Sequence, residues 1–277
     1  DAINIEKIKL YHHYVQQLQA KLAALKLDEG STQQLITILN SLTDLLYFRS
    51  IVKRLQANEP IQYIFGDTEF YGLLMKCDSR ALIPRPETEE LIEWIVEESK
   101  NLKIQQPNNL NILDIGTGSG CIPISLKKEL PNAEVFTIDV SEKALEMARK
   151  NAVDNEVEVN FMLKNILETD SLVEKYDVIV SNPPYVRNLE KQEIKKNVLA
   201  YEPHLALFVE DSDALLFYRK IAQLALTSLT PNGKLFFEIN QYLGKETVEL
   251  LENLGFKNIE LRKDFVGNDR MICCEAP

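Results

Sequence analysis

The sequence predicts an α/β protein in which a mostly parallel sheet is covered by helices on both faces. Two observations carry this prediction. From residue 111 onward, short apolar runs of strand length alternate with stretches of helical periodicity, an order typical of parallel sheets. The first of these runs also leads through a glycine-rich turn, Gly116 to Gly120, into a helical stretch. Turns of this kind lie at the ligand-binding edge of such sheets.

Residues 1–60 precede this alternation and are helical by pattern. Their apolar residues recur at spacings of three and four, which predicts one face of a long helix: Ile5, Ile8, Tyr11, Val15, Leu18, Leu22 and Leu25. Ser31 then offers an N-cap with an amide three residues later, which predicts a second helix. We expect a small helical bundle that either recognises a protein partner or only stabilises the rest of the chain. His12 and His13 have no acidic partners at ligand spacing, so no metal site is expected.

The remaining chain is expected to comprise a linker, 61–83, and a main domain, 84–277. Aromatic, polar and glycine residues alternate in the linker, which predicts a β-hairpin. Strands are then expected at 111–115, 134–139, 157–163, 176–181, 234–239, 257–263 and 270–275. Helices are expected at 122–130, 142–153, 213–229 and 244–254. The last two strands are expected to form an antiparallel pair.

The glycine-rich turn belongs to the motif Asp114-Ile-Gly-Thr-Gly-Ser-Gly, which follows the strand 111–115. Its glycines permit positive φ and let the backbone approach a ligand closely. Asp139 ends the next strand, where open α/β sheets place a carboxylate on a ribose. The order of strand, turn, helix and acid predicts nucleoside binding. A glycine turn beside a solvated aspartate is the alternative that needs no ligand.

A second motif, Asn182-Pro183-Pro184-Tyr185, directly follows the apolar run 178–180. The side-chain oxygen of Asn182 lies beside the carbonyl of Pro183, a residue without an N–H. Two acceptors with no local donor suit an –NH2 group. Tyr185 adds a π-face that can attract a cation. A turn that closes a strand would account for the same four residues, and only the glycine-rich motif upstream makes a binding site the better interpretation.

Together the two motifs resemble those of S-adenosylmethionine-dependent methyltransferases that act on planar amide or exocyclic amino nitrogens. Five further segments resemble the HemK-like family of peptide chain release factor glutamine methyltransferases: EPIQYIFG from residue 59, FYG from 70, LIPRPETE from 82, YEP from 201 and DFVGNDR from 264. The resemblance covers about residues 59–275. It implies a Rossmann-like methyltransferase domain with a mostly parallel seven-stranded sheet, and S-adenosylmethionine as the cofactor, with S-adenosylhomocysteine as product.

The resemblance also implies roles for single residues. Those expected to bind the cofactor are Gly116, Thr117, Gly118, Ser119, Gly120, Asp139, Asn165, Ile166, Leu167 and Asn182. Among them the glycine turn would hold the methionyl end, and residues 165–167 would surround the adenine, although relatives commonly carry an acid and an aromatic there. Asn182 and Pro183 are expected to accept the two N–H groups of a substrate amide. Pro184 and Tyr185 complete the expected substrate pocket, and Tyr185 is counted with Asn182 and Pro183 as catalytic.

The implied activity is methylation of the glutamine in the Gly-Gly-Gln motif of release factors, which supports translation termination. A ribosomal-protein glutamine methyltransferase is the near alternative, and a DNA or RNA adenine N6 methyltransferase is a more distant one. A non-catalytic module that binds S-adenosylmethionine or a partner is a third class, which the intact Asn182 motif disfavours.

Composition bears on the partners and the compartment. The chain has 31 basic and 42 acidic residues, a net charge of −11, which repels phosphate backbones. Free nucleic acid is therefore not an expected substrate. No apolar run approaches the ~20 residues of a membrane span, and no signal-peptide pattern is present. The four cysteines lack metal-site spacing. We expect a cytoplasmic monomer without a metal, whose cysteines are reduced and structural.

Overall fold

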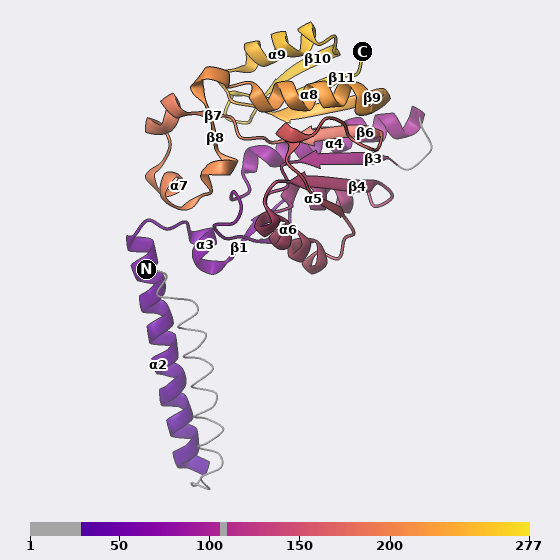
Figure 1. Ribbon diagram of the computed structural model, residues 1–277. Coiled ribbons are helices and arrows are strands. Elements are labelled where there is room, and N and C mark those ends of the chain that lie inside the picture. Colours follow the sequence, from indigo (N-terminus) through magenta and orange to yellow (C-terminus); the bar gives the residue numbers. More distant parts are fainter. Residues whose placement is uncertain (1–28, 106–109) are drawn as a thin grey trace. The chain divides into compact units, whose positions relative to one another are not determined.

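The computed structural model describes residues 29–105 and 110–277 of the 277-residue chain (Figure 1). The chain divides into two compact units, residues 1–64 and 65–277. Across the two described stretches, no helix is both long and apolar enough to cross a membrane.

In the first unit, the first expected helix and the two adjacent histidines fall outside the described residues. The second expected helix is present as α2 (Glu29–Gln56), so it begins two residues before the predicted cap at Ser31. Large apolar side chains along this helix are exposed, with Phe48 at 63%. Lys53 and Arg54 lie in its last turn, where positive charge suits the helix dipole.

Arg54 also fixes the chain that follows α2. Its Nε donates to Oε2 of Glu59 (2.7 Å), and its guanidinium donates to the carbonyl oxygens of Tyr63 (3.0 Å) and Ile64 (3.2 Å). These two residues belong to a short helix, α3 (Ile61–Phe65), in a segment where the sequence predicted part of a hairpin. Five residues are too few for helical periodicity to be visible in a sequence.

The predicted hairpin is present, although it is shorter than 61–83. β1 (Asp67–Phe70) pairs antiparallel with β2 (Leu73–Lys76). Tyr71 and Gly72 join them, both with positive φ (51° and 69°). Two such residues in a two-residue loop match the twist of the flanking strands. This hairpin lies in the second unit.

The second unit is built on the expected seven-stranded sheet, in the order β10-β11-β9-β6-β3-β4-β5. The strands are β3 (Asn111–Ile115), β4 (Glu134–Asp139), β5 (Asn160–Leu163), β6 (Tyr176–Ser181), β9 (Leu229–Glu238), β10 (Lys257–Lys263) and β11 (Asp269–Glu275). The five strands from β9 to β5 are parallel, and β11 is antiparallel to both of its neighbours. The chain runs outward from β3 through β4 to β5 and then returns to β6 on the other side of β3. Open sheets bind ligands at such a switch point.

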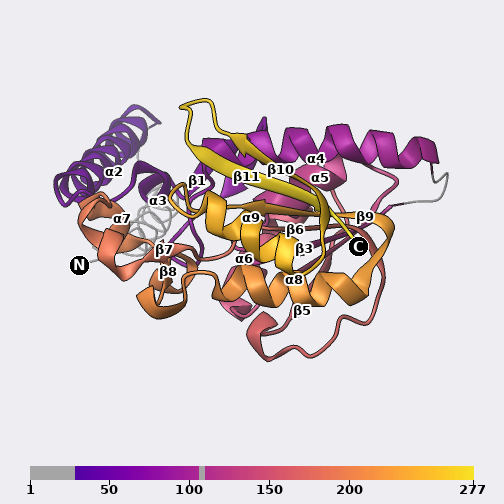
Figure 2. The ribbon, with the colours of Figure 1, turned by 90° about the horizontal axis from the view of Figure 1, so that it is seen from above.

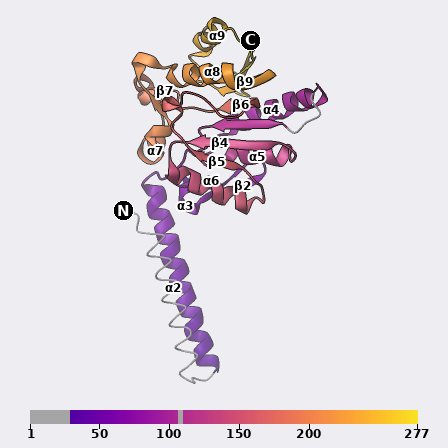
Figure 3. The same cartoon turned by 45° about the vertical axis from the view of Figure 1, so that its right-hand side comes forward.

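Helices cover both faces of the sheet, as predicted (Figure 2). They are α4 (Pro86–Gln105), α5 (Cys121–Glu129), α6 (Glu142–Asp154), α8 (Leu216–Ser228) and α9 (Gly244–Asn253). The buried cluster on one face contains side chains of α4, α5 and α6, and the cluster on the other contains those of α8 and α9. α5 and α6 lie on the same face and both contact β4 (Figure 3).

Neighbouring residues of the central strands pack into opposite faces, because side chains alternate along a strand. On β9, Phe236 meets Trp94 of α4 edge to face with ring centroids 5.5 Å apart, whereas Phe237 meets Tyr218 of α8 at 5.2 Å. The core therefore has two halves, and the strands between them are apolar on both sides, as is usual for parallel sheets.

Between β6 and α8 the chain forms a smaller substructure. β7 (Val186–Arg187) pairs in parallel with β8 (Phe208–Val209), and α7 (Lys196–Tyr201) lies between them in sequence. The helix predicted at 213–229 begins only at Leu216, after a 3-10 turn at Asp211–Asp213.

Candidate active site

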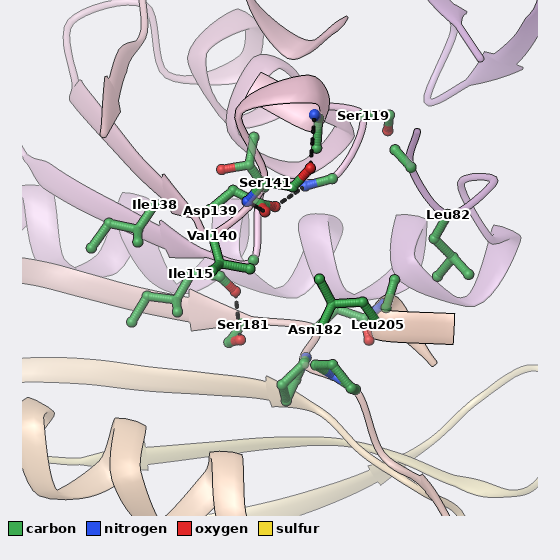
Figure 4. A pocket seen from close by; sticks show the side chains of 18 of the residues that line it. Leu82, Ile115, Ser119, Ile138, Asp139, Val140, Ser141, Ser181, Asn182 and Leu205 are labelled. Carbon is green, nitrogen blue, oxygen red and sulfur yellow. Dashed lines mark hydrogen bonds between the residues drawn. The ribbon is translucent and has the colours of Figure 1, made fainter. Parts of the chain in front are cut away.

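A cavity of about 300 Å³ opens at the carboxyl ends of β3, β4 and β6 (Figure 4). Its main lining comes from five segments: 80–85, 115–119, 138–141, 164–167 and 181–184. All of them belong to the unit 65–277. The cavity therefore lies where the sequence placed both motifs, at the switch point of the sheet.

The glycine-rich turn supplies one wall. Gly116 and Gly118 have positive φ (90° and 53°) and line the cavity, together with Thr117 and Ser119. Gly120 also has positive φ, but it is not part of the lining. A Cβ there would lie 2.9 Å from the Ile124 side chain and 3.0 Å from that of Ala148. Gly120 is thus required for the packing of α5 against α6.

Asp139 ends β4 and faces the cavity with its carboxylate held by the backbone (Figure 4). Oδ2 accepts from the N–H of Gly118 (2.9 Å), and Oδ1 accepts from that of Ser141 (2.8 Å). Burial raises the pKa of Asp139, and these hydrogen bonds oppose the shift. A carboxylate has about four acceptor sites, more than the backbone N–H groups of Gly118, Ser141 and Val140 occupy, so the group can still accept from a ligand.

Asp114 lies beneath the same turn and is fully buried. Its Oδ2 accepts from the hydroxyl of Thr137 (2.6 Å), which also contacts the hydroxyl of Thr117. Burial raises the pKa of Asp114 to about 7. Asp114 does not line the cavity, so it acts on the site by supporting the turn.

Asn165, Ile166 and Leu167 line the cavity in a 3-10 turn after β5. Oδ1 of Asn165 accepts from the N–H of Leu167 (3.1 Å), and the carbonyl of Asn165 accepts from the hydroxyl of Thr169 (2.8 Å). The side chain of Asn165 thus closes its own turn, and Ile166 is buried.

Asn182, Pro183 and Pro184 line the cavity directly after β6. The strand end is tied to β3 because the hydroxyl of Ser181 donates to the carbonyl of Ile115 (2.6 Å; Figure 4). Nδ2 of Asn182 lies 3.4 Å from Oγ1 of Thr88, in the first turn of α4. Three residues of the motif therefore meet Asp139 and the glycine turn around one cavity.

Tyr185 lies differently from its three predecessors. It is not part of the cavity lining, and it packs against the core cluster under α8 and α9. Its hydroxyl donates to Oε1 of Glu238, the last residue of β9 (3.1 Å), and its carbonyl accepts from Nδ2 of Asn240 (2.9 Å). Burial first, and then the nearby charge of Glu238, raise the pKa of Tyr185 well above its usual value.

Comparison with known proteins shows the family to which the chain belongs. Residues 99–205 match the methyltransferase small domain family. A release factor glutamine methyltransferase of Flavobacterium psychrophilum is 65% identical over 228 residues, which cover 82% of this chain and 79% of that protein. The chain belongs to the family of release factor glutamine methyltransferases.

Two further proteins extend the comparison. A release factor glutamine methyltransferase of Bacteroides thetaiotaomicron is 48% identical over 80% of this chain and 78% of that protein. A crystal structure of a methyltransferase from Pyrococcus furiosus superimposes with a TM-score of 0.53 at 21% identity, over 74% of this chain and 90% of that chain. The last comparison supports the fold alone. As a member of its family, the chain is an S-adenosylmethionine-dependent methyltransferase.

The structure of this methyltransferase also brings together residues whose pairing the sequence did not reveal. Glu202, with a side chain only 1% exposed, accepts from Nη2 of Arg85 (2.7 Å) and from the N–H of Ile83 (3.1 Å). The segments LIPRPETE and YEP are therefore joined at the cavity. Each was recognisable as a motif, but a separation of 117 residues between Arg85 and Glu202 hides the contact from any local pattern.

Proposed function

We propose that this chain transfers the methyl group of S-adenosylmethionine to the side-chain amide nitrogen of the glutamine in the Gly-Gly-Gln motif of peptide chain release factors. The observation that carries this proposal is the position of Asn182 and Pro183 on the wall of one cavity with Asp139 and the glycine turn. A relative that is 65% identical over 82% of this chain is a release factor glutamine methyltransferase.

The residues around the cavity fit the cofactor. Positive φ at Gly116 and Gly118 brings backbone to the cavity surface without side chains, which suits the methionyl end. Asp139 can accept from the ribose hydroxyls with its remaining lone pairs. Residues 164–167 would lie around the adenine, with Ile166 as the apolar contact. When bound, the cofactor supplies an electrophilic methyl group.

The chain's own residues would position the nucleophile. An amide nitrogen reacts poorly because its lone pair is delocalised into the carbonyl. The rate of methyl transfer therefore depends more on the orientation of this nitrogen than on a general base that removes its proton. We infer that Oδ1 of Asn182 and the carbonyl of Pro183 each accept one N–H of the substrate amide. Two acceptors fix the nitrogen toward the methyl group and favour the positive charge that develops on it. The excess proton can then leave to water.

The role of Tyr185 in this proposal follows from its contacts. Its ring packs into the core and its hydroxyl is bonded to Glu238. We therefore infer that Tyr185 acts with Pro184 mainly by holding the rim of the substrate pocket in place, rather than by offering its ring to a cation.

We further propose that residues 1–60 contribute recognition of the release factor, that residues 61–83 link them to the methyltransferase domain 84–277, and that the enzyme acts as a cytoplasmic monomer. Among the described residues, those that line the cavity all lie after residue 79, which supports a role of residues 1–60 in recognition and not in the chemistry.

The test is a comparison of methyl acceptors. Tritiated S-adenosylmethionine would be supplied with purified release factor, the same factor with its Gly-Gly-Gln glutamine changed to alanine, ribosomal proteins, and DNA. We expect label only in the unaltered release factor. Label in ribosomal protein or in DNA instead would overturn the proposed substrate.

A further inference from the structure

One buried carboxylate, that of Glu238, holds Tyr185 directly and reaches Asn182 at the other end of the motif through Thr88. Glu238 is 1% exposed. Its Oε2 accepts from the hydroxyl of Thr88 (2.6 Å), and its Oε1 accepts from the hydroxyl of Tyr185 (3.1 Å). Thr88, itself 2% exposed, lies 3.4 Å from Nδ2 of Asn182. Thr88 has no part in the mechanism described above, and Glu238 enters it only as the partner of the Tyr185 hydroxyl.

The direction of these hydrogen bonds fixes the orientation of Asn182. A hydroxyl has a single proton to donate. The hydroxyl of Thr88 gives this proton to Oε2 of Glu238, a carboxylate oxygen that accepts when the group is ionised. The oxygen of Thr88 can then only accept, and it pairs with the –NH2 of Asn182 rather than with its carbonyl oxygen. Since the two groups are the two branches of one planar amide, Oδ1 of Asn182 is left available for the substrate.

Three contacts of Glu238 oppose the loss of charge that burial favours. Burial raises the pKa of Glu238, while the hydroxyls of Thr88 and Tyr185 and the charge of Arg270 oppose this shift. Arg270 is itself fixed, because its Nε donates to Oδ2 of Asp264 (3.0 Å). The segment DFVGNDR, which contains both residues, thus helps to stabilise the carboxylate that orients the motif.

We propose that Thr88 and Glu238 are positioning residues for methyl transfer, which hold the side-chain oxygen of Asn182 in the orientation that accepts a substrate N–H. This inference rests on the proposed function, because it assumes that Asn182 binds the amide that is methylated. Without the hydroxyl of Thr88, the amide of Asn182 can rotate by half a turn and present –NH2 to the substrate, which repels its N–H groups. Misplacement of a reacting group by about 1 Å can lower a rate by roughly 100-fold.

Three substitutions separate positioning from packing. Thr88→Val keeps the volume and removes the hydroxyl, Thr88→Ser keeps the hydroxyl and removes a methyl group, and Glu238→Gln keeps the size but introduces a donor. We expect kcat to fall by about 10- to 100-fold for Thr88→Val and for Glu238→Gln. Thr88→Ser should keep most of the activity. The Kd for S-adenosylmethionine, measured by calorimetry, should change little in all three.

The deciding measurement is a double-mutant cycle with Asn182→Ala. If Thr88 acts through Asn182, then Thr88→Val should lower kcat far less when Asn182 has already been replaced. A contribution of Thr88 to packing alone would lower kcat equally in both backgrounds, or would lower stability without a change in kcat, and either result would overturn the proposal. If Thr88→Val does not fold, Thr88→Ala takes its place in the cycle, since it also lacks the hydroxyl.

The cycle is run with whichever acceptor the wild-type enzyme methylates. If that acceptor is not the release factor glutamine but the coupling between Thr88 and Asn182 is found, the proposed substrate fails and the positioning role stands. If release factor is methylated and no coupling is found, only the positioning role fails.

Discussion

The side chain of Asn151 on α6 binds both backbone groups of Lys76 on the hairpin. Oδ1 accepts the N–H of Lys76 (2.6 Å), and Nδ2 donates to its carbonyl (3.1 Å) and also to the carbonyl of Ser119 (2.8 Å). One buried amide therefore joins the hairpin, α6 and the glycine turn that lines the cavity. The hairpin is in this way part of the methyltransferase domain's structure, in addition to the linking role that we propose for it.

We expect Asn151→Ala to lower the free energy of unfolding by about 2–4 kcal/mol, because it removes three hydrogen bonds to the backbone of Lys76 and Ser119, each with a net contribution of ~0.5–1.5 kcal/mol. Urea denaturation measures this loss. Asn155→Ala is the matched control, since Asn155 lies one turn further along and its link to the hairpin is a single bond to the Leu74 carbonyl (3.0 Å). Equal losses for the two variants would contradict the role assigned to Asn151.

Asp139→Ala should weaken binding of S-adenosylmethionine by about 1–3 kcal/mol, the contribution of charge-assisted hydrogen bonds in a partly buried cleft. The variant also removes the acceptor for the N–H groups of Gly118 and Ser141. Calorimetry gives the affinity. Glu142→Gln removes a nearby charge outside the cavity lining and serves as the control. Unchanged affinity in Asp139→Ala would remove this residue from the proposed cofactor site.

The sequence predicted the sheet well where strands are uninterrupted apolar runs. β3, β4, β6 and β10 have the predicted bounds. β9 begins at Leu229 rather than 234, because its first residues include Pro231 and Gly233, which usually indicate a turn. β5 begins at Asn160 rather than 157. The alternation of apolar and polar residues starts at Val157, before the first residue that pairs with β4.

The candidate site was predictable only in part, because some of its contacts join residues that are far apart in the sequence. Asp139, Asn182 and the glycine turn follow strands directly, so the topology of a parallel sheet brings them to one edge. Thr88 and Glu238 are 150 residues apart and meet only because α4 packs against β9. A local sequence pattern cannot indicate such a contact. The same separation conceals the bond between Arg85 and Glu202.

Stability should depend on pH through Asp114, whose pKa burial raises to about 7. Its value in an unfolded chain is about 3.9. Between these values the folded protein binds more protons than the unfolded one, so the contribution of Asp114 is full below about pH 4 and is lost as the pH rises through 7. The slope from this group is at most about 1.4 kcal/mol per pH unit.

Asp114→Asn keeps an acceptor for the Thr137 hydroxyl and removes the titration. We therefore expect its free energy of unfolding to fall less between about pH 5 and pH 8 than that of the unaltered protein. Urea denaturation at several pH values measures both curves. Asp154→Asn, on the exposed end of α6, is the control and should follow the unaltered protein. Parallel curves for Asp114→Asn and the unaltered protein would show that Asp114 does not titrate in this range.

We propose that residues 1–60 recognise the release factor and that the domain 84–277 transfers the methyl group. These separate roles can be tested by replacing residues 1–58 with a short linker. Because the cavity is lined by residues from Arg80 onward, S-adenosylmethionine should bind with nearly unchanged affinity. Methylation of whole release factor should fall sharply, since the proposed recognition surface is gone. Equal rates for the truncated and intact enzymes would leave residues 1–58 with a purely stabilising role.

Substitutions of Asn182 distinguish a role in orienting the substrate amide from a role in binding the cofactor. Asn182→Ala removes one of the two proposed amide acceptors, while Asp139 and the glycine turn remain, so kcat should fall by roughly 10²–10³ with little change in cofactor affinity. Asn182→Asp keeps an acceptor of similar size but adds a negative charge near the sulfonium of the cofactor. It should bind S-adenosylmethionine at least as tightly and still transfer methyl slowly, because a carboxylate has no –NH2 to pair with Thr88 and the substrate amide is misplaced. Near-normal transfer to release factor by Asn182→Ala would mean that the motif only closes a strand and that the substrate nitrogen is held by other residues.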